Sequence, residues 1–305
     1  MKILIADDDP VSRRVLEAAL LRLGHEAVAA VDGTAALSVL AAPDAPRLAI
    51  LDWMMPGADG LTVCRTLRQR SGPYTYVILL TARDHPDALV EALDAGADDF
   101  LTKPVNRMEL RVRLQSGERI VALQEDLLRT QAALTHLATH DRLTGLWNRG
   151  GVVDELGREL QRAKREQAPL AVAMVDLDHF KSINDSHGHA AGDAALQQLS
   201  ARIKSLLRAT DALGRWGGEE FLLVMPRSNL AGAREVAERL RAAVANEPVR
   251  VGSTDLWVTV TIGLASTATA GFDPALLVAS CDDALYRGKA AGRNRVEAAT
   301  IAAPI

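Results

Sequence analysis

The chain has 305 residues, of which 48% are hydrophobic and 24% are charged, and its formal net charge is −4. This length predicts two domains, and the composition is that of an ordinary globular protein with a sizeable core. The slightly negative charge argues against a protein that binds nucleic acid through a broad basic surface.

The chain opens with a short apolar run, residues 3–6, that ends in Asp7-Asp8-Asp9. This run is too short for a signal peptide, and no stretch reaches the roughly 18 consecutive apolar residues that a membrane span needs. The two cysteines, Cys64 and Cys281, lie far apart without ligand-like spacing, so we expect neither a disulfide framework nor a zinc site. We therefore expect a soluble, cytoplasmic protein with no membrane partner.

Residues 1–118 alternate short apolar runs with helical patterns. Continuous apolar runs, typical of strands buried on both faces of a parallel sheet, lie at 3–6, 49–51 and 77–80. Helical patterns cover 12–23, 34–40 and 88–95, with Gly24 and Gly96 as expected helix stops. The pattern predicts a doubly wound α/β domain with its ligand crevice at the carboxyl ends of the strands.

Polar side chains follow the predicted strands of this first domain. Asp7 and Asp8 follow the first strand and Asp52 the third, so three carboxylates should converge at one edge of the sheet. Clustered carboxylates repel one another unless a hard cation such as Mg²⁺ lies among them. Such a cation would also neutralise charge while a carboxylate attacks a phosphoryl group. Thr81 and Lys103, at the same edge, could bind the phosphoryl oxygens.

In this order, the residues resemble the receiver domains of response regulators, over essentially all of 1–118. The resemblance implies a flavodoxin-like fold in which Asp52 accepts a phosphoryl group from a cognate sensor histidine kinase. It implies that Asp7, Asp8, Asp52 and the Met54 backbone carbonyl hold Mg²⁺. The residues expected to respond to the phosphate are Thr81, Lys103 and the switching aromatic Phe100. Alone, each would be a turn or surface residue, and a receiver that works without phosphorylation stays an open alternative.

Between residues 108 and 140 the chain has no proline and only one glycine. Its apolar spacing fits a heptad seam made of Ile120, Leu123, Leu127, Leu134 and Leu137, with Thr130 as the polar exception. We predict one long helix whose 119–139 portion links the two domains and pairs with a second copy as a coiled coil. The alternative is a solvated helix whose leucines pack on its own domains.

From residue 141 onward, strands and helices alternate again. The predicted elements lie at 170–175, 196–207, 220–225, 231–244, 256–265 and 274–289. Alternation over 258–262 is typical of a half-exposed strand. We predict an α/β sandwich with an antiparallel sheet over 140–298, followed by a disordered, alanine-rich tail at 299–305.

Two glycines and two acids come together at a predicted hairpin. Gly217 and Gly218 suit a tight turn with positive φ, and they let a nucleotide approach the backbone. Glu219 at this turn can face Asp176, which ends the apolar run 170–175. Two carboxylates beside bound phosphates can hold one or two Mg²⁺ ions, which stabilise an in-line displacement at phosphorus.

These residues resemble the GGDEF family of diguanylate cyclases, here in its Gly-Gly-Glu-Glu-Phe form. Further matching stretches lie at 141–149, 176–185, 188–193 and 284–294, so the resemblance covers 140–297. It implies a nucleotidyl-cyclase-like fold with a mainly antiparallel sheet. It also implies the joining of two GTP molecules into cyclic di-GMP, with release of pyrophosphate.

The resemblance also implies individual roles. Asp176, the Leu177 carbonyl and Glu219 would bind the metal, and Glu219 or Glu220 would help to remove the proton of the 3′-hydroxyl. Asn184 and Asp193 would recognise guanine. The residues expected to neutralise or make room for the triphosphate are Lys181, Lys289, Arg293, Gly217 and Gly218.

Arg208-Ala209-Thr210-Asp211 resembles the Arg-x-x-Asp product-inhibition site of the same family. The resemblance implies that Arg208 and Asp211 bind cyclic di-GMP, with Arg239 as a further contact. A weak surface ion pair is the plainer reading of this spacing.

Each cyclase domain offers one GTP site, so two chains must face each other as a homodimer. We expect phosphorylation of Asp52 to align the two sites through the helix around 108–140. The alternatives are an inactive nucleotide-binding effector that recruits a protein partner, and a cyclase that acts on one nucleotide. A DNA-binding response regulator is the weakest option, because the two domains account for the sequence.

Overall fold

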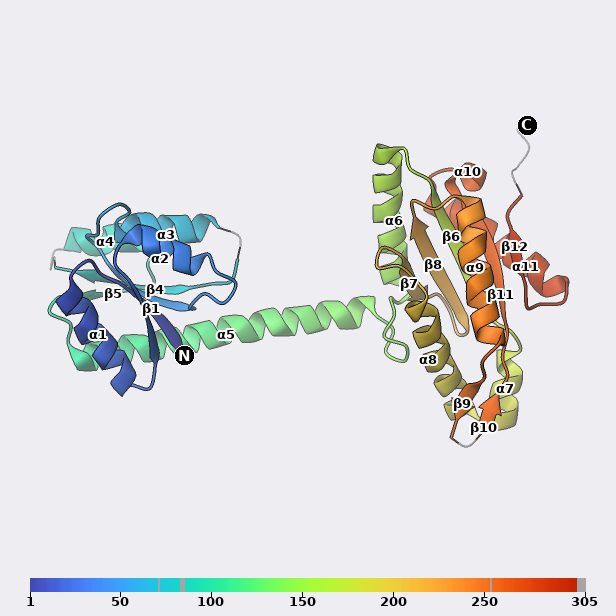
Figure 1. The fold of residues 1–305 in the computed structure, drawn as a ribbon, viewed down its shortest axis with the longest axis horizontal. Helices are drawn as coiled ribbons and strands as arrows, with labels where there is room; N and C mark the ends of the chain where they lie inside the picture. The colour runs from blue at the N-terminus through green and yellow to red at the C-terminus, as the bar shows by residue number, and fades with distance from the viewer. Residues whose placement is uncertain (71, 83–85, 253, 301–305) are drawn as a thin grey trace. The chain divides into compact units, whose positions relative to one another are not determined.

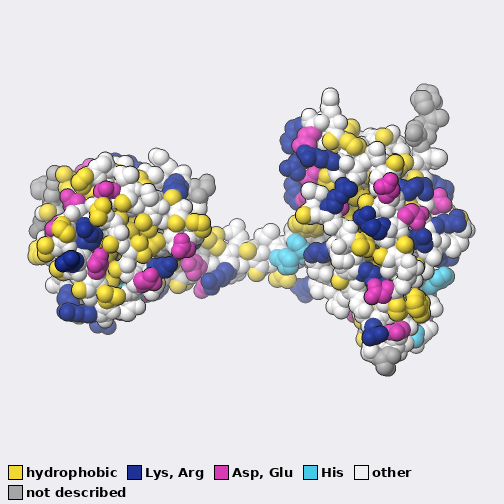
Figure 2. Space-filling view, viewed as in Figure 1, with side chains coloured by type: hydrophobic (Ala, Val, Ile, Leu, Met, Phe, Trp, Pro, Cys, Tyr) yellow, Lys and Arg dark blue, Asp and Glu magenta, His cyan; other side chains and the backbone are white. Residues whose placement is uncertain are grey.

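The computed structural model describes residues 1–70, 72–82, 86–252 and 254–300 (Figure 1). The chain divides into two compact units, Met1–Ala132 and Ala133–Ile305. Among the described residues, no helix is long and apolar enough to cross a membrane. On the face drawn in Figure 2, basic side chains lie among acidic ones over both units.

The first unit contains one parallel five-stranded sheet in the order β2-β1-β3-β4-β5. This order is the flavodoxin-like arrangement that the sequence predicts. The strands are β1 (Lys2–Ala6), β2 (Glu26–Ala30), β3 (Leu48–Asp52), β4 (Tyr76–Thr81) and β5 (Asp99–Thr102). The helices are α1 (Pro10–Arg22), α2 (Gly33–Leu40), α3 (Gly60–Gln69), α4 (Pro86–Asp94) and the start of α5 (Arg107–Thr139).

Helices cover both faces of this sheet (Figure 1). Side chains of α2, α3 and α4 pack on one face, while those of α1 and α5 pack on the other. Local sequence fixes the helix ends: Asp9 caps α1 by accepting from the amides of Val11 and Ser12, and Gly24 and Gly96 have positive φ. Both glycine stops are therefore where the sequence predicts them.

Helix α5 runs unbroken for 33 residues. Its first turns are buried on the receiver sheet through Leu110, Leu114, Gly117 and Val121. The predicted heptad residues are exposed instead: Ile120 41%, Leu123 63%, Leu127 60%, Leu134 61% and Leu137 53%. These exposed side chains are free to meet a second copy, and both the coiled coil and the self-packed linker stay predictions.

The second unit is built on a five-stranded sheet in the order β12-β11-β6-β8-β7. All pairs are antiparallel except β11 with β12, which confirms the mainly antiparallel prediction. The strands are β6 (Leu170–Leu177), β7 (Ala212–Arg215), β8 (Glu220–Pro226), β11 (Val260–Ser266) and β12 (Val296–Ala298). A separate hairpin pairs β9 (Val249–Val251) with β10 (Thr254–Leu256).

Helices again form layers on both faces of the sheet. Side chains of α8 (His189–Ser205) and α9 (Leu230–Ala245) pack on one face, and those of α6 (Arg149–Glu166) and α11 (Pro274–Ala290) on the other. Alternate residues of β6 enter the two cores, as a strand buried on both faces requires. The short helices α7 (Phe180–His187) and α10 (Thr267–Ala270) complete the unit.

Two predictions about the strand near residue 260 are wrong. The continuous strand expected at 256–265 is split between β10 and β11, and β11 is buried along its whole length rather than half-exposed. Helix α11 covers its second face so closely that a Cβ on Gly263 would lie 2.0 Å from the Cys281 carbonyl oxygen. Ala299, the first residue of the expected tail, is buried, and its amide donates to the Leu264 carbonyl. Residues 301–305 of that tail lie outside the described residues.

Candidate functional site

Three carboxylates meet at the carboxyl end of the receiver sheet. Asp7 and Asp8 follow β1, and Asp52 ends β3; one oxygen of each lies within 4.8 Å of the others. Asp7 is fully buried, Asp52 is 8% exposed and Asp8 is exposed. Helix α3 begins directly beneath, since a Cβ on Gly60 would lie 2.5 Å from the Asp52 carbonyl oxygen. The predicted convergence of the three acids is therefore present.

Lys103 lies between two of these acids. Its Nζ is 2.9 Å from Asp7 Oδ2 and 2.8 Å from Asp52 Oδ2. Burial raises the pKa of Asp52, and the charges of Asp7 and Asp8 add to this, while Lys103 opposes it. Because the cluster is short of positive charge, its donor set fits a hard cation such as Mg²⁺.

The remaining receiver residues lie around this cluster. Thr81 ends β4 and is buried, and its carbonyl accepts from the Lys103 amide at 2.8 Å. The Met54 side chain is 66% exposed, and Phe100 is half-buried on β5 with the Arg113 guanidinium 5.9 Å from its ring. The Ser12 hydroxyl, which the sequence analysis missed, donates to Asp7 Oδ2 at 2.6 Å.

A second group of acids lies where β6 ends beside the turn that precedes β8. Asp176 pairs across the strands with Glu220, and the Leu177 amide donates to the Glu219 carbonyl at 3.2 Å. Burial raises the pKa of Asp176 to about 6; Glu219 and Glu220 add to the rise, and Lys289 opposes it. Lys289 Nζ lies 2.8 Å from Asp176 Oδ2. A buried carboxylate that is repelled by two others is a fitting Mg²⁺ ligand.

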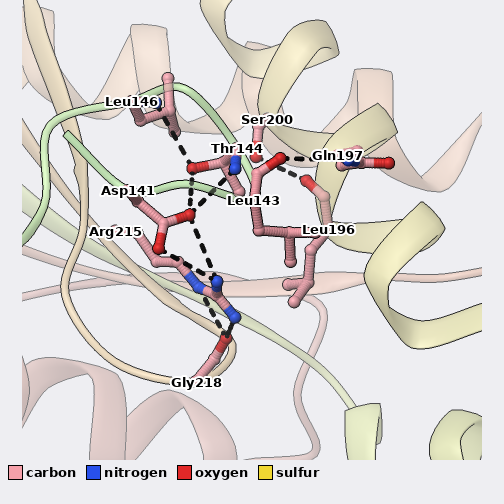
Figure 3. A network of polar contacts seen from close by, with 9 residues as sticks. All are labelled: Asp141, Leu143, Thr144, Leu146, Leu196, Gln197, Ser200, Arg215 and Gly218. Carbon is pink, nitrogen blue, oxygen red and sulfur yellow. Dashed lines mark hydrogen bonds and ion pairs between the residues drawn. The ribbon is translucent and has the colours of Figure 1, made fainter. Parts of the chain in front are cut away.

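One arginine, Arg215, holds the turn between β7 and β8 (Figure 3). Arg215 donates to the Gly218 carbonyl at 2.8 and 3.1 Å and to Asp141 at 3.3 Å. Asp141 in turn accepts from the Thr144 amide and hydroxyl. Burial works against a charged Asp141, but the bonds from Thr144 and Arg215 outweigh it and lower the pKa of this carboxyl. The segment around 141–144 therefore fixes the turn that carries Glu219.

The expectation that Gly217 and Gly218 need positive φ is wrong. Neither lies in the left-handed region, because the turn is closed by the Trp216 and Gly217 amides donating to the Glu220 carbonyl. A Cβ on Gly218 would meet nothing within 4 Å, and the nearest atoms to one on Gly217 all belong to the Glu220 side chain. The glycines leave open space above the turn, in keeping with the room predicted for a triphosphate.

The two predicted guanine-binding residues come from adjacent helices, α7 and α8. Asn184 lies in the middle of α7, and its buried Oδ1 has no hydrogen-bond partner among the described residues. Gly192 faces it: a Cβ there would lie 2.0 Å from this oxygen. Asp193, the next residue of α8, is exposed. An unpartnered buried acceptor beside an exposed carboxylate can receive donors from a base.

Of the three basic residues predicted to bind the triphosphate, two have exposed side chains and one contacts an acid. Lys181 is exposed in the first turn of α7, while Lys289 lies on α11 against Asp176. Arg293 is exposed just beyond α11, with a φ of 63°. Of these three, only Lys289 contacts an acid that is expected to bind the metal.

The Arg208–Asp211 segment forms a closed turn. The Arg208 amide donates to Asp211 Oδ2 at 2.9 Å, and the Asp211 amide donates back to the Arg208 carbonyl. The Arg208 side chain is exposed and lines, with Asp211, Lys204 and Trp147, a cavity of about 410 Å³. Arg239 donates to the Leu206 carbonyl at 3.2 Å, close to this turn in the chain.

Asp178 is a buried acid to which the sequence motifs assign no role. This residue is 3% exposed and accepts from the hydroxyls of Thr259 and Thr261 and from the Asn294 amide. Thr259 and Thr261 stand two residues apart, so they share one face of the strand. That spacing was the available signal.

Two protein families match the chain. The family described as "Diguanylate cyclase, GGDEF domain" matches residues 138–295, and "Response regulator receiver domain" matches 3–115. Response regulator PleD of Caulobacter vibrioides is 32% identical over 298 residues, which are 97% of this chain and 65% of PleD. The chain thus spans less than two thirds of this relative.

Solved structures resemble the second unit. The coiled coil and GGDEF domain of DgcB from Caulobacter crescentus, in complex with c-di-GMP, has a TM-score of 0.56 at 29% identity. The match covers 64% of this chain and 100% of that one. Diguanylate cyclase SiaD of Pseudomonas aeruginosa, in complex with its activator SiaC, has a TM-score of 0.52 at 37% identity, with 63% and 74% covered.

Proposed function

The chain belongs to the GGDEF family and carries a receiver domain ahead of its GGDEF domain, and we propose that it makes cyclic di-GMP under the control of phosphorylation. One observation carries the enzymatic half of this proposal. Asp176 is a buried carboxylate with a raised pKa, beside Glu219 and Glu220 and under an open glycine turn. Three carboxylates there face the single ammonium of Lys289, which leaves room for a cation, and the open turn leaves space for phosphates.

The reaction joins the 3′-oxygen of one GTP to the α-phosphorus of another, and the bond to pyrophosphate breaks. Bound Mg²⁺ would lower the pKa of the attacking hydroxyl and neutralise the developing charge on phosphorus. Asp176, the Leu177 carbonyl and Glu219 would hold it, and Glu219 or Glu220 would take the hydroxyl proton. Asn184 and Asp193 would bind guanine, while Lys181, Lys289 and Arg293 would bind the triphosphate.

Two chains must bring their sites together for this chemistry, because each GGDEF domain offers one GTP site. The exposed heptad residues of α5 support a homodimer, since burial of five large apolar side chains favours association. A sensor histidine kinase would phosphorylate Asp52, and the change in the receiver would reach the catalytic domains through α5. Cyclic di-GMP bound at Arg208 and Asp211, with Arg239 nearby, would inhibit the enzyme.

The test is a turnover assay of the full chain with GTP and Mg²⁺, read as both pyrophosphate and cyclic di-GMP. We expect product from the wild type, more of it with beryllofluoride, and no beryllofluoride effect in Asp52→Ala. Glu219→Gln should abolish product, whereas Glu235→Gln, an exposed acid on α9, should not. Arg208→Ala should relieve inhibition by added cyclic di-GMP.

The second candidate is an inactive effector that binds nucleotide and recruits a protein. It would bind GTP in equilibrium measurements without releasing pyrophosphate in any phosphorylation state. That result, from a folded wild-type protein, would remove the proposed activity. Product formation from ATP at the same rate as from GTP would remove the guanine assignments.

A further inference from the structure

Asp178 is the most heavily bonded buried acid of the second unit and has no role in the chemistry described so far. It follows β6 directly and is 3% exposed. Its Oδ1 accepts from Thr261 Oγ1 at 2.6 Å, and its Oδ2 accepts from Thr259 Oγ1 at 2.7 Å. A buried carboxylate needs such donors, because an unsatisfied charge in the interior is strongly unfavourable.

A third donor comes from a distant part of the chain. The Asn294 amide donates to Asp178 Oδ2 at 3.1 Å, across 116 positions of sequence. The Asp178 amide itself donates to the Thr259 carbonyl at 2.9 Å. One side chain therefore joins the end of β6, the approach to β11 and the segment that follows α11.

That segment has an unfavourable backbone. Gly292, Arg293 and Asn294 have φ values of 108°, 63° and 45° in succession. Non-glycine residues in the left-handed region are strained and persist only where surrounding contacts hold them. The holding contacts include the Arg293 amide, which donates to the Gly288 carbonyl at 3.1 Å. Asn294 is held by the bond of its amide to Asp178 and by the Arg241 guanidinium, which donates to Asn294 Oδ1 at 2.9 Å.

The segment matters because it carries Arg293, a proposed triphosphate ligand, and follows Lys289, which already contacts Asp176. Asp178 lies two residues after Asp176, the proposed metal ligand. Through its bond to the Asn294 amide, Asp178 connects this end of β6 to the backbone next to Arg293. From this geometry we infer that Asp178 is a positioning residue, which holds Arg293 at the triphosphate of GTP without touching the nucleotide. The inference rests on the proposed function for the identity of the ligand.

The test is a double-mutant cycle on equilibrium GTP binding by the full chain with Mg²⁺, measured calorimetrically. Asp178→Asn should weaken GTP binding roughly tenfold, the scale of one lost hydrogen bond to a charged group. In an Arg293→Ala background the same change should weaken binding less than about twofold, because the arginine it positions is already gone. Asp154→Asn, an exposed acid on α6, is the matched control and should bind GTP as the wild type does.

A purely structural role would instead give equal losses in both backgrounds, and that outcome would overturn the inference. So would unchanged GTP binding in Asp178→Asn. If Asp178→Asn does not fold, Thr259→Val repeats the cycle, since it removes one donor and leaves the carboxylate in place; we expect a weakening of about threefold that disappears in Arg293→Ala. Binding is measured apart from turnover, so a wild type that binds GTP but makes no product contradicts the proposed activity and leaves this inference standing.

Discussion

Replacing Gly192 with alanine should impair guanine recognition while leaving the fold intact. Gly192 lies in the first turns of α8, where a Cβ would be 2.0 Å from Asn184 Oδ1 and 3.0 Å from Phe180 Cζ. Ordinary contact distances require the Asn184 amide to retreat by roughly 1.5 Å, which is more than a hydrogen bond tolerates. The Asn184 side chain, rather than the backbone, should absorb this movement.

The magnitude follows from the lost hydrogen bonds to the base. Leaving buried donors and acceptors unpaired costs about 1–3 kcal/mol, which corresponds to a roughly 5- to 150-fold weaker GTP affinity. Replacing a glycine by alanine inside a helix also stabilises that helix by about 1 kcal/mol. GTP affinity should therefore fall, while the stability of the fold should rise or stay near that of the wild type.

The assay is calorimetric GTP binding alongside thermal unfolding. Gly157→Ala is the matched control, because Gly157 is also helical and a Cβ there would meet nothing within 4 Å. Asn184→Ala should weaken binding to a similar degree, and the double variant should be no worse than either single one. GTP affinity in a folded Gly192→Ala protein equal to that of Gly157→Ala would refute the placement of Asn184 at the base.

Further predictions concern charge, pH and packing. Lys103→Met removes the ammonium that lies between Asp7 and Asp52. We expect calorimetry to show that the receiver loses up to about 3 kcal/mol of stability and that added Mg²⁺ restores it. An unchanged melting profile would contradict this expectation. Burial, then repulsion from His136 and Lys204, lowers the pKa of His140 below its usual 6.5, so the folded state binds this proton less readily than the unfolded one. The melting temperature should therefore fall as the pH drops from 7 through 6.5 and below, and it should fall less steeply in His140→Gln. Parallel pH profiles of the two proteins would show that His140 does not cause the fall. Gly263→Ala drives a Cβ to 2.0 Å from the Cys281 carbonyl oxygen and should cost roughly 3 kcal/mol in urea unfolding; wild-type stability would mean that α11 lies farther from β11.

Sequence patterns predict best the elements that are buried on two faces. The runs at 49–51 and 77–80 became the centre of the receiver sheet, because continuous apolar residues fit only a strand covered on both sides. Strand β2 was missed, since Glu26–Ala30 is alanine-rich and half-exposed at the sheet edge. Helix α6 was missed despite a readable pattern, with Val152, Leu156 and Leu160 four residues apart after the Asn148 cap.

Long-range partners decide what sequence patterns cannot. The alternation at 258–262 is typical of a half-exposed strand, but Thr261 is fully buried because its hydroxyl bonds Asp178, 83 positions away. The glycine turn was expected to need positive φ, yet its conformation depends on Arg215 and the Glu220 carbonyl. In both cases the local pattern is compatible with two structures, and a distant side chain selects one of them.

Both acidic sites place an ammonium against the carboxylate expected to bind the metal. Lys103 lies 2.8 Å from Asp52, and Lys289 lies 2.8 Å from Asp176. In each case burial raises the pKa of the acid and the lysine opposes that rise, so the lysine keeps a buried carboxylate available in its charged form. A bound Mg²⁺ would take over this neutralisation and free the lysine for the phosphoryl oxygens that the metal also binds. The same exchange would serve phosphoryl transfer to Asp52 and nucleotidyl transfer beside Asp176, which gives two unrelated folds one electrostatic solution.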